Sequence, residues 1–239
     1  TLTPWTETNV TAALIPQPPT PARVVAETTY ADVGITDWHL SNGIRVLVKP
    51  TTYKADQVFV VGEAAGGLSL LSDDQLVDGA LATSVVQQSG AGAFDAQSLR
   101  NKLAGKIALV LPQIDETSEG ALAFAAPKDL ESALQVFWLT LTSPRLDTTA
   151  VAAFRNQVRT AIANRGDTPD AVFGDTVRMT MGRYGPRSQP MTVARIDHFD
   201  PAHSLSLFKD WFRDFNGFTF VIVGNVNVDS LRPLVEQWI

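Results

Sequence analysis

The chain has 239 residues, of which 45% are hydrophobic and 18% charged, and its formal net charge is −6. These values are ordinary for a globular protein with one large domain or two small ones. The acidic balance, without basic runs, argues against nucleic acid as a partner. No apolar run approaches the roughly 20 residues of a membrane span, so we expect no membrane insertion. There is no cysteine, which excludes disulfides and thiolate metal sites.

Residues 1–33 are predicted to form a proline-rich linker. Four prolines between Pro16 and Pro21 favour extended, polyproline-like backbone. A linker of this length implies a preceding segment, and the floppy terminus of a standalone protein is the alternative. The sequence stops at Ile239, inside a helical pattern. Residues 34–239 are therefore expected to form a single inactive peptidase-like α+β domain cut from a longer chain.

The first expected elements are strands. Trp38 to Leu40 and Ile44 to Lys49 flank the dipeptide Asn42-Gly43, and Asn-Gly between two β-rich runs is a strong hairpin signal. Further strands are expected at residues 58–61, 107–111, 122–125 and 218–223. Helices are expected at residues 74–88, 96–104, 130–141, 151–162 and 170–181, from residue 201 and from residue 228. This order predicts an α+β fold with a mainly antiparallel sheet and helices packed on one face.

The histidines do not have the spacing of a zinc site. Such a site needs three or four His, Cys, Asp or Glu side chains at one point. The chain has only His39, His198 and His203. The last two are five residues apart with Pro201 between them, unlike the helical histidine pairs that bind zinc. We interpret all three as loop or cap residues, and we expect no metal ligand in this chain.

Other catalytic patterns have simpler explanations. The acidic pairs Asp73-Asp74, Asp115-Glu116 and Asp197/Asp200 precede apolar segments or lie in turns, where helix capping explains them better than acid/base catalysis. Gly90-Ala91-Gly92 follows a helix and lacks the third glycine of a dinucleotide site, so a helix C-cap is the better interpretation. No Gly-x-Ser-x-Gly elbow is present. We therefore expect no catalytic and no cofactor-binding residue.

One polar loop has the composition of a recognition surface. Arg183, Tyr184 and Arg187 lie between the glycine and proline residues of the stretch 182–190. Arginine and tyrosine are common in recognition surfaces, so these three residues are candidates for a substrate-facing loop. An exposed basic loop without a ligand is the alternative.

Four segments of the sequence match, in the same order along the chain, segments that characterise a known protein family. They are the hairpin from Trp38 to Thr51, the strand and Gly-Gly turn at 58–67, the two-helix stretch at 130–147, and the strand with its Val-Gly-Asn-Val turn at 218–228. Over about residues 34–239 they resemble the repeated domains of the pitrilysin/insulinase zinc metallopeptidases. The resemblance implies the α+β fold of pitrilysin/mitochondrial-processing-peptidase-like metallohydrolases.

In that family the first domain carries zinc on a helix with a His-x-x-Glu-His motif, and the other domains share the fold without the ligands. The corresponding positions here are Leu81-Ala82-Thr83-Ser84-Val85, so no catalytic or metal residue is carried over. The segment from Lys49 to Asp56, together with the proline-rich stretch, resembles the third of four domains of a bacterial member. That placement makes the periplasm the expected compartment.

The resemblance implies a non-catalytic structural and substrate-enclosing domain of a larger zinc metalloendopeptidase that degrades peptides or unfolded protein. Its partners would be the other domains of the parent chain and the enclosed peptide, and zinc would lie in the parent's catalytic domain. The alternative is a non-peptidase binding or scaffold module, like the family's inactive subunits. A His-x-x-Glu-His segment upstream of Thr1 in the same gene would favour the first interpretation, and its absence there and in any adjacent gene would favour the alternative. An unrelated enzyme that uses Asp and Arg residues is a third option.

Overall fold

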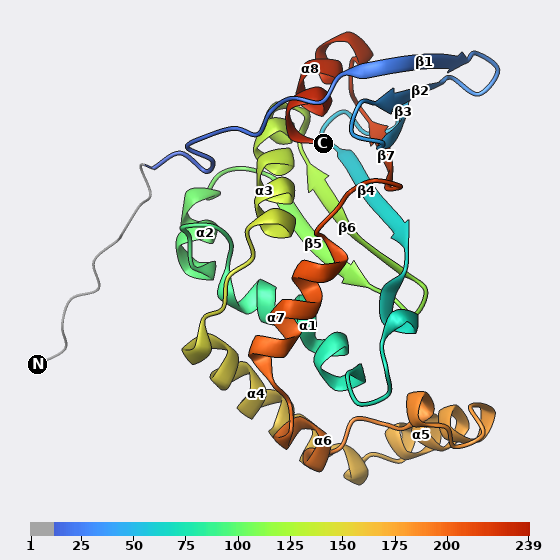
Figure 1. Cartoon of the computed structure of the whole chain (residues 1–239), viewed down its shortest axis with the longest axis vertical. Coiled ribbons are helices and arrows are strands. Elements are labelled where there is room, and N and C mark those ends of the chain that lie inside the picture. The colour runs from blue at the N-terminus through green and yellow to red at the C-terminus, as the bar shows by residue number, and fades with distance from the viewer. Residues whose placement is uncertain (1–11) are drawn as a thin grey trace, which may run out of the picture.

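The computed structural model describes residues 12–239, so residues 1–11 of the predicted linker lie outside the described part (Figure 1). Its strands are β1 (Val24–Tyr30), β2 (Ile35–Leu40), β3 (Arg45–Pro50), β4 (Val58–Ala65), β5 (Ala108–Ile114), β6 (Ser118–Ala125) and β7 (Thr219–Gly224). Its α-helices are α1 (Leu76–Ser89), α2 (Ala96–Lys102), α3 (Leu130–Thr142), α4 (Thr148–Ala163), α5 (Pro169–Met181), α6 (Val193–Asp197), α7 (Pro201–Trp211) and α8 (Val228–Trp238). No described helix is both long and apolar enough to cross a membrane.

All the strands belong to one sheet with the order β1-β2-β3-β7-β4-β6-β5. Five of the six neighbouring pairs are antiparallel, and only β3 and β7 run parallel. The last strand of the chain thus inserts at the centre, between two strands of the N-terminal part. Phe220 and Ile222 of β7 are 2% and 0% exposed, as expected for a central strand. The predicted α+β fold with a mainly antiparallel sheet is confirmed.

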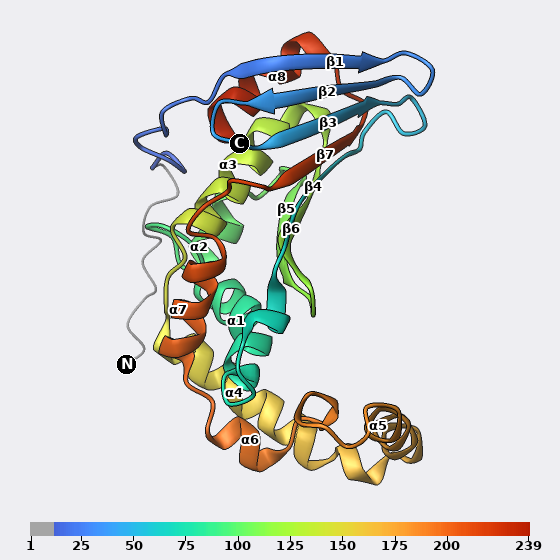
Figure 2. The same cartoon turned by 45° about the vertical axis from the view of Figure 1, so that its right-hand side comes forward.

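The helices cover one face of this sheet, as predicted. Figure 2 shows α1, α2, α3 and α7 on one side of β4, β5 and β6; no helix covers the other side, and α5 lies below the lower ends of these strands. The fully buried Leu134 of α3 belongs to the same core as Val60 of β4. The ring of Phe137 on α3 lies 5.5 Å from that of Phe220 on β7. The main hydrophobic core therefore lies between the helical layer and the covered face of the sheet.

The linker prediction is wrong for residues 24–30, which form β1 and pair antiparallel with β2. Six of these seven residues are exposed, so the strand has no buried, alternating face that would mark it in the sequence. Partners far along the chain hold it in place. The Val24 amide donates to Glu236 on α8 (2.9 Å), and Arg232 on α8 pairs with Glu27 (3.0 Å).

Glu119 is a buried carboxylate close to the covered face of β6. It is 8% exposed and accepts a hydrogen bond from the backbone amide of Gly67, in the short helix η1 (Gly67–Leu70). Gly67 has a φ of 66°, a left-handed conformation that glycine adopts without steric cost. Burial raises the pKa of Glu119 above its ordinary value, and the hydrogen bond from Gly67 opposes this shift only in part.

The raised pKa predicts a pH-dependent stability. The folded chain holds the Glu119 proton more tightly than the unfolded chain, so this group's contribution is fully present below the unfolded pKa and is lost as pH rises through the folded pKa. We expect Glu119→Gln to increase the free energy of unfolding relative to the wild type at about pH 8 but not at about pH 4. Urea unfolding of both proteins at the two pH values measures this difference.

Glu119→Ala provides the control, because it removes the acceptor for the Gly67 amide and should destabilise the protein at both pH values. If the stability difference between Glu119→Gln and the wild type is the same at both pH values, the raised pKa is contradicted.

Candidate functional site

The helix that would carry zinc in an active domain is α1, and its side chains here are unsuited to a metal. At the positions 81–85, Ala82 and Val85 are fully buried in the protein core. Val85 packs with Val151 of α4 and Ile196 of α6. Within residues 12–239 there is no group of three or more His, Cys, Asp or Glu side chains that could hold a metal ion. The side chains at positions 81–85 therefore do not fit a zinc ion.

The histidine with the most contacts serves to join two helices. The Nδ1 atom of His203 on α7 lies 2.7 Å from Oδ2 of Asp78 on α1. The backbone amide of Asp200 donates to Oδ1 of Asp78 (2.9 Å), and the Ser204 hydroxyl donates to the Asp78 carbonyl (2.7 Å). Since Asp78 binds three parts of the α7 segment, the arrangement holds α1 and α7 together. The remaining histidines are the exposed His39 of β2 and His198 at the C-cap of α6.

Of the acidic pair Asp197/Asp200, one residue caps a helix and the other forms an ion pair. Asp200 caps α7 by accepting from the amides of Ala202 (2.8 Å) and His203 (3.3 Å), as predicted. Asp197 instead pairs with Arg159 of α4 at 2.9 Å. Arg159 lowers the pKa of the Asp197 carboxyl through this hydrogen bond, so the group stays charged rather than poised to transfer protons.

The face of the sheet opposite the helices carries two rows of apolar side chains, which we call the open face. Strand register sets one row as Leu47, Val221, Val61, Leu122 and Leu111, and the other as Val223, Phe59, Phe124 and Leu109. All nine side chains are partly or fully exposed, and Leu109 reaches 51%. The rings of Phe59 and Phe124 meet edge to face at 4.5 Å. The open face is therefore a continuous apolar surface across five strands.

Beside β2 the open face ends at a pair of charged side chains, Arg45 of β3 and Asp37 of β2. The Arg45 guanidinium donates to both carboxylate oxygens of Asp37, with its shortest bond at 2.7 Å. The Asp37 side chain is only 3% exposed, and the hydrogen bond from Arg45 holds the pKa of its carboxyl below the usual value. The charges at this border are thus paired with each other rather than free to bind a ligand.

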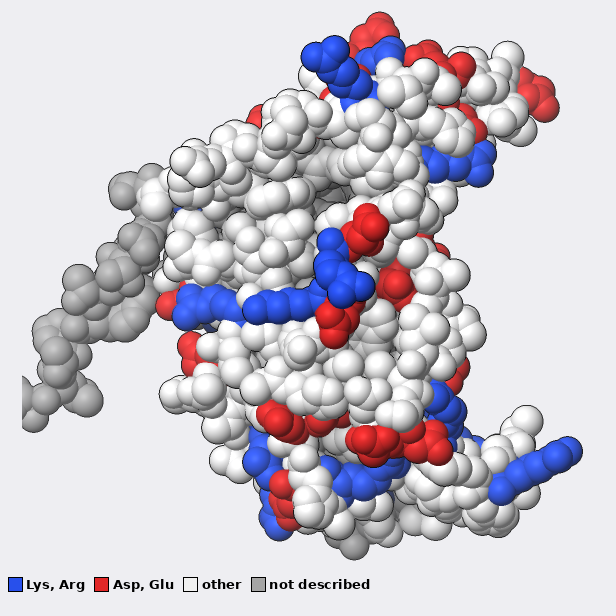
Figure 3. Space-filling view, viewed as in Figure 1, with Lys and Arg blue, Asp and Glu red and all other residues white. Residues whose placement is uncertain are grey.

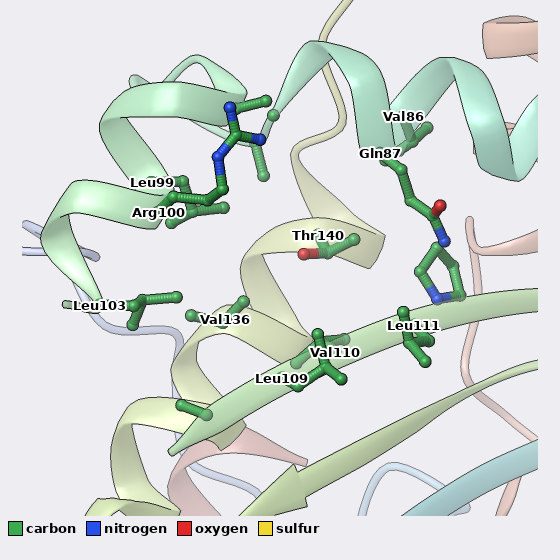
Figure 4. A pocket seen from close by; sticks show the side chains of 15 residues that line it. Val86, Gln87, Leu99, Arg100, Leu103, Leu109, Val110, Leu111, Val136 and Thr140 are labelled. Atoms are coloured by element: carbon green, nitrogen blue, oxygen red, sulfur yellow. The ribbon is translucent and has the colours of Figure 1, made fainter. Parts of the chain in front are cut away.

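A second apolar feature is a groove of about 370 Å³ between β5, α1, α2 and α3. Figure 4 shows Leu99 of α2, Leu103 at the C-cap of α2, Val136 of α3 and Val110 of β5 around it. The polar side chains at its wall are Gln87, Arg100 and Thr140, which do not include a nucleophile with a base. The groove has room for an apolar side chain.

In the candidate loop at 183–187, Arg187 contacts other parts of the chain, whereas Arg183 and Tyr184 are exposed. The Arg187 guanidinium donates to the carbonyls of Leu68 (3.0 Å) and Leu71 (2.6 Å), and it pairs with Glu116 (2.9 Å). Arg187 thus braces the loop after η1 and is not free to bind a substrate. Tyr184 is 62% exposed, and Arg183 is also exposed, so for these two residues the substrate-facing role stays a prediction.

Arg187 makes hydrogen bonds to the loop after η1 and Arg183 is exposed, so substitutions of these two arginines should affect stability differently. Arg187→Ala leaves two carbonyl acceptors without their charged donor, and we expect it to lower the free energy of unfolding by about 1–3 kcal/mol. Arg183→Ala is the matched control and should change stability by no more than about 0.5 kcal/mol. Chemical denaturation of both variants measures these values. Equal effects of the two substitutions would rule out the brace.

Sequence reasoning did not identify the open face or the apolar groove. The available signal was the near-continuous apolar character of residues 218–223, which indicates burial on both faces or a central place in a sheet. Combined with helices on one face only, that signal leaves a set of apolar side chains without cover. The pairing of these side chains into rows requires the strand register, which no single segment encodes.

Comparison with known proteins gives relatives that are much longer than this chain. No protein-family model matches. The chain is 26% identical, over all of its 239 residues, to a zinc protease PQQL-like protein of Arabidopsis thaliana, of which it covers 22%. It is 22% identical over 216 residues to a probable zinc protease PqqL of Haemophilus influenzae, covering 90% of the chain and 23% of that protein. The chain thus spans less than a quarter of the length of these relatives.

Solved structures show the same fold. The periplasmic protease PqqL from Escherichia coli superposes with a TM-score of 0.78 at 23% identity, covering all of this chain and 26% of that one. A peptidase M16 inactive domain from Pseudomonas fluorescens gives a TM-score of 0.65 at 14% identity, over 85% of this chain and 50% of that one. The resemblance to the pitrilysin/insulinase zinc metallopeptidases is confirmed: the chain is a homologue of one segment of the PqqL-like zinc proteases, with the fold of a peptidase M16 domain.

Proposed function

We propose that this chain is a non-catalytic structural and substrate-enclosing domain of a larger zinc metalloendopeptidase that degrades peptides or unfolded protein. The observation that carries the proposal is the open face, a sheet surface with two apolar rows and no covering helix within residues 12–239. Contiguous apolar patches on a protein surface mark binding sites for other proteins, ligands or membranes. An unfolded peptide offers the apolar side chains that such a surface can bind.

The chemistry of the open face suits enclosure rather than reaction. Burial of apolar area contributes about 25 cal/mol per Å² without directional contacts, so the surface would bind many sequences weakly. The charges at its border, Asp37 and Arg45, are occupied by each other. A surface of this kind supports retention of varied peptides near a catalytic centre that another domain supplies.

The parent protein would provide the zinc and the general base. In zinc peptidases a bound metal activates water and polarises the substrate carbonyl. The positions 81–85 of this chain contain no ligand for such a metal, and this chain aligns to less than a quarter of each relative described as a zinc protease. We therefore assign this chain the place of an inactive domain, the third of four, which contacts the other domains of the same polypeptide and the enclosed peptide.

The periplasm is the compartment we propose for the parent. The structural relative from Escherichia coli is described as a periplasmic protease. The chain has no cysteine, which is compatible with that compartment.

Peptide binding to the open face is the test of this function. The double variant Val61→Thr/Val221→Thr keeps the side-chain shape and the strand propensity while it makes the centre of the open face polar. We expect its affinity for a fluorescently labelled, permanently unfolded polypeptide to fall by roughly three- to tenfold, about 0.7–1.4 kcal/mol. Fluorescence anisotropy titration of the purified chain measures the change.

The control is Val25→Thr/Val33→Thr, two exposed valines outside the open face, which should bind as the wild type does. A wild-type chain that does not bind the polypeptide, or a control that weakens as much as the test variant, would refute the proposal. Binding of the polypeptide by the complete gene product without chelator-sensitive cleavage would favour the scaffold alternative.

A further inference from the structure

The helix α5 and the residues after it form an apolar surface separate from the open face. Figure 2 shows α5 at the lower end of the molecule, away from the sheet and the helices that cover it. None of its 13 residues is buried. A helix of this length is marginal in water on its own, so its stability depends on contacts with other parts of a protein.

The orientation of α5 is inverted in one respect: its charged residue Asp175 faces its own chain, between Ala171 and Met179, while most of its large apolar residues face outward. The side turned toward its own chain presents Ala171, Asp175 and Met179, which are partly buried. Asp175 accepts two hydrogen bonds from Arg165 in η3 (Arg165–Asp167), at 2.7 and 3.0 Å. The side turned outward carries Phe173 (71% exposed) and, within the same stripe, further large apolar residues. In an ordinary surface helix the apolar stripe faces the core and the charged residues face solvent.

We call the outward residues the α5 stripe: Val172, Phe173, Val177, Met181 and Tyr184. Phe173, Val177 and Met181 follow at four-residue intervals, so they lie on one side of the helix. Met181 is 82% exposed and Val177 39%. Single exposed apolar residues are normal, but Phe173, Val177 and Met181 form a row on one side of the helix, and Val172 and Tyr184 are exposed near it. In Figure 3 the lower right end of the molecule, where Figure 1 places α5, shows few charged side chains apart from a basic one at its tip.

The end of α5 extends the stripe. Arg183 and Tyr184 have φ angles of 51° and 57°, a left-handed conformation that residues other than glycine seldom adopt. The Tyr184 amide donates to the Met179 carbonyl at 2.7 Å, which closes the helix. This turn places Tyr184 directly after the helical stripe and leaves its side chain 62% exposed. Strained backbone of this kind clusters at sites with a binding or switching role.

We propose that the α5 stripe docks in an apolar groove on another domain of the same polypeptide, with acidic side chains of that domain beside Arg178 and Arg183. This inference rests on that part of the proposed function which places the chain in a longer polypeptide. The inverted orientation of α5 supports it, because Asp175 already has its partner within the chain while the apolar side has none among the described residues.

The size of the surface favours an intramolecular partner over a second copy of the chain. Stable complexes between separate molecules bury about 800 Å² on each side, roughly 20–30 residues, and the α5 stripe has five. A domain tethered in the same polypeptide binds at an effective concentration in the millimolar range, so a small patch is sufficient. The chain spans only 22% of its Arabidopsis thaliana relative, which leaves ample polypeptide in such a protein to supply the groove.

Hydrogen exchange tests the docking directly. The complete gene product is compared with the 239-residue chain, and the exchange of the amides of residues 172–184 is followed by mass spectrometry. We expect exchange at least tenfold slower in the complete gene product. Phe173→Glu should abolish this protection there and leave the exchange of the 239-residue chain unchanged, because Phe173 is already exposed in it. Tyr53→Glu, at a 93% exposed aromatic residue of the β3–β4 loop, is the matched control and should have no effect on α5.

Equal exchange of α5 in the two proteins would overturn the proposal, as would protection that survives Phe173→Glu. Protection that appears in the 239-residue chain alone and rises with its concentration would also overturn it, by showing that a second copy is the occupant. The unfolded-polypeptide titration of Val61→Thr/Val221→Thr reports on the open face alone, so its failure would leave the docking of α5 intact.

Discussion

The insertion of β7 between β3 and β4 is the contact on which the rest of the structure depends. Its partners are roughly 160 to 175 residues away in sequence, and its pairing with β3 is the only parallel one in the sheet. β7 joins two three-stranded halves, β1-β2-β3 and β4-β6-β5, that would otherwise be separate sheets. Its buried side chains, Phe220 and Ile222, meet the helical layer, while Val221 and Val223 complete the open face. One strand therefore sets both the core and the candidate binding surface.

The division of the molecule into a covered and an open face separates the hydrophobic core from the candidate binding surface. The helices supply the core with apolar cover on one side only. The other side keeps an apolar surface that a protein standing alone would normally bury or make polar. The α5 stripe is a second such surface, at a different place on the molecule. Two uncovered apolar surfaces on one chain are expected of a domain that contacts substrate on one side and neighbouring domains on another.

The sequence predicted those features that depend on local patterns. The Asn42-Gly43 turn gives the β2–β3 hairpin, and the period of Leu130, Leu134, Phe137 and Leu141 gives α3. β1 was missed because its side chains are exposed, so its pairing leaves no apolar pattern. The five-residue helix α6 was also missed, although Thr192 caps it and Ile196 is buried. The open face, the Arg187 brace and the inverted orientation of α5 depend on contacts between distant segments, which residue patterns alone do not specify.

The most direct test of the account is the structure of the complete gene product with an unfolded peptide trapped inside it, determined by cryo-electron microscopy. We expect the rows of Val61 and Phe59 on the open face to line an enclosed chamber, with the peptide between them and a zinc site on another domain. An open face that looks onto bulk solvent, or that packs against another domain without space for a peptide, would contradict the role of a substrate-enclosing domain.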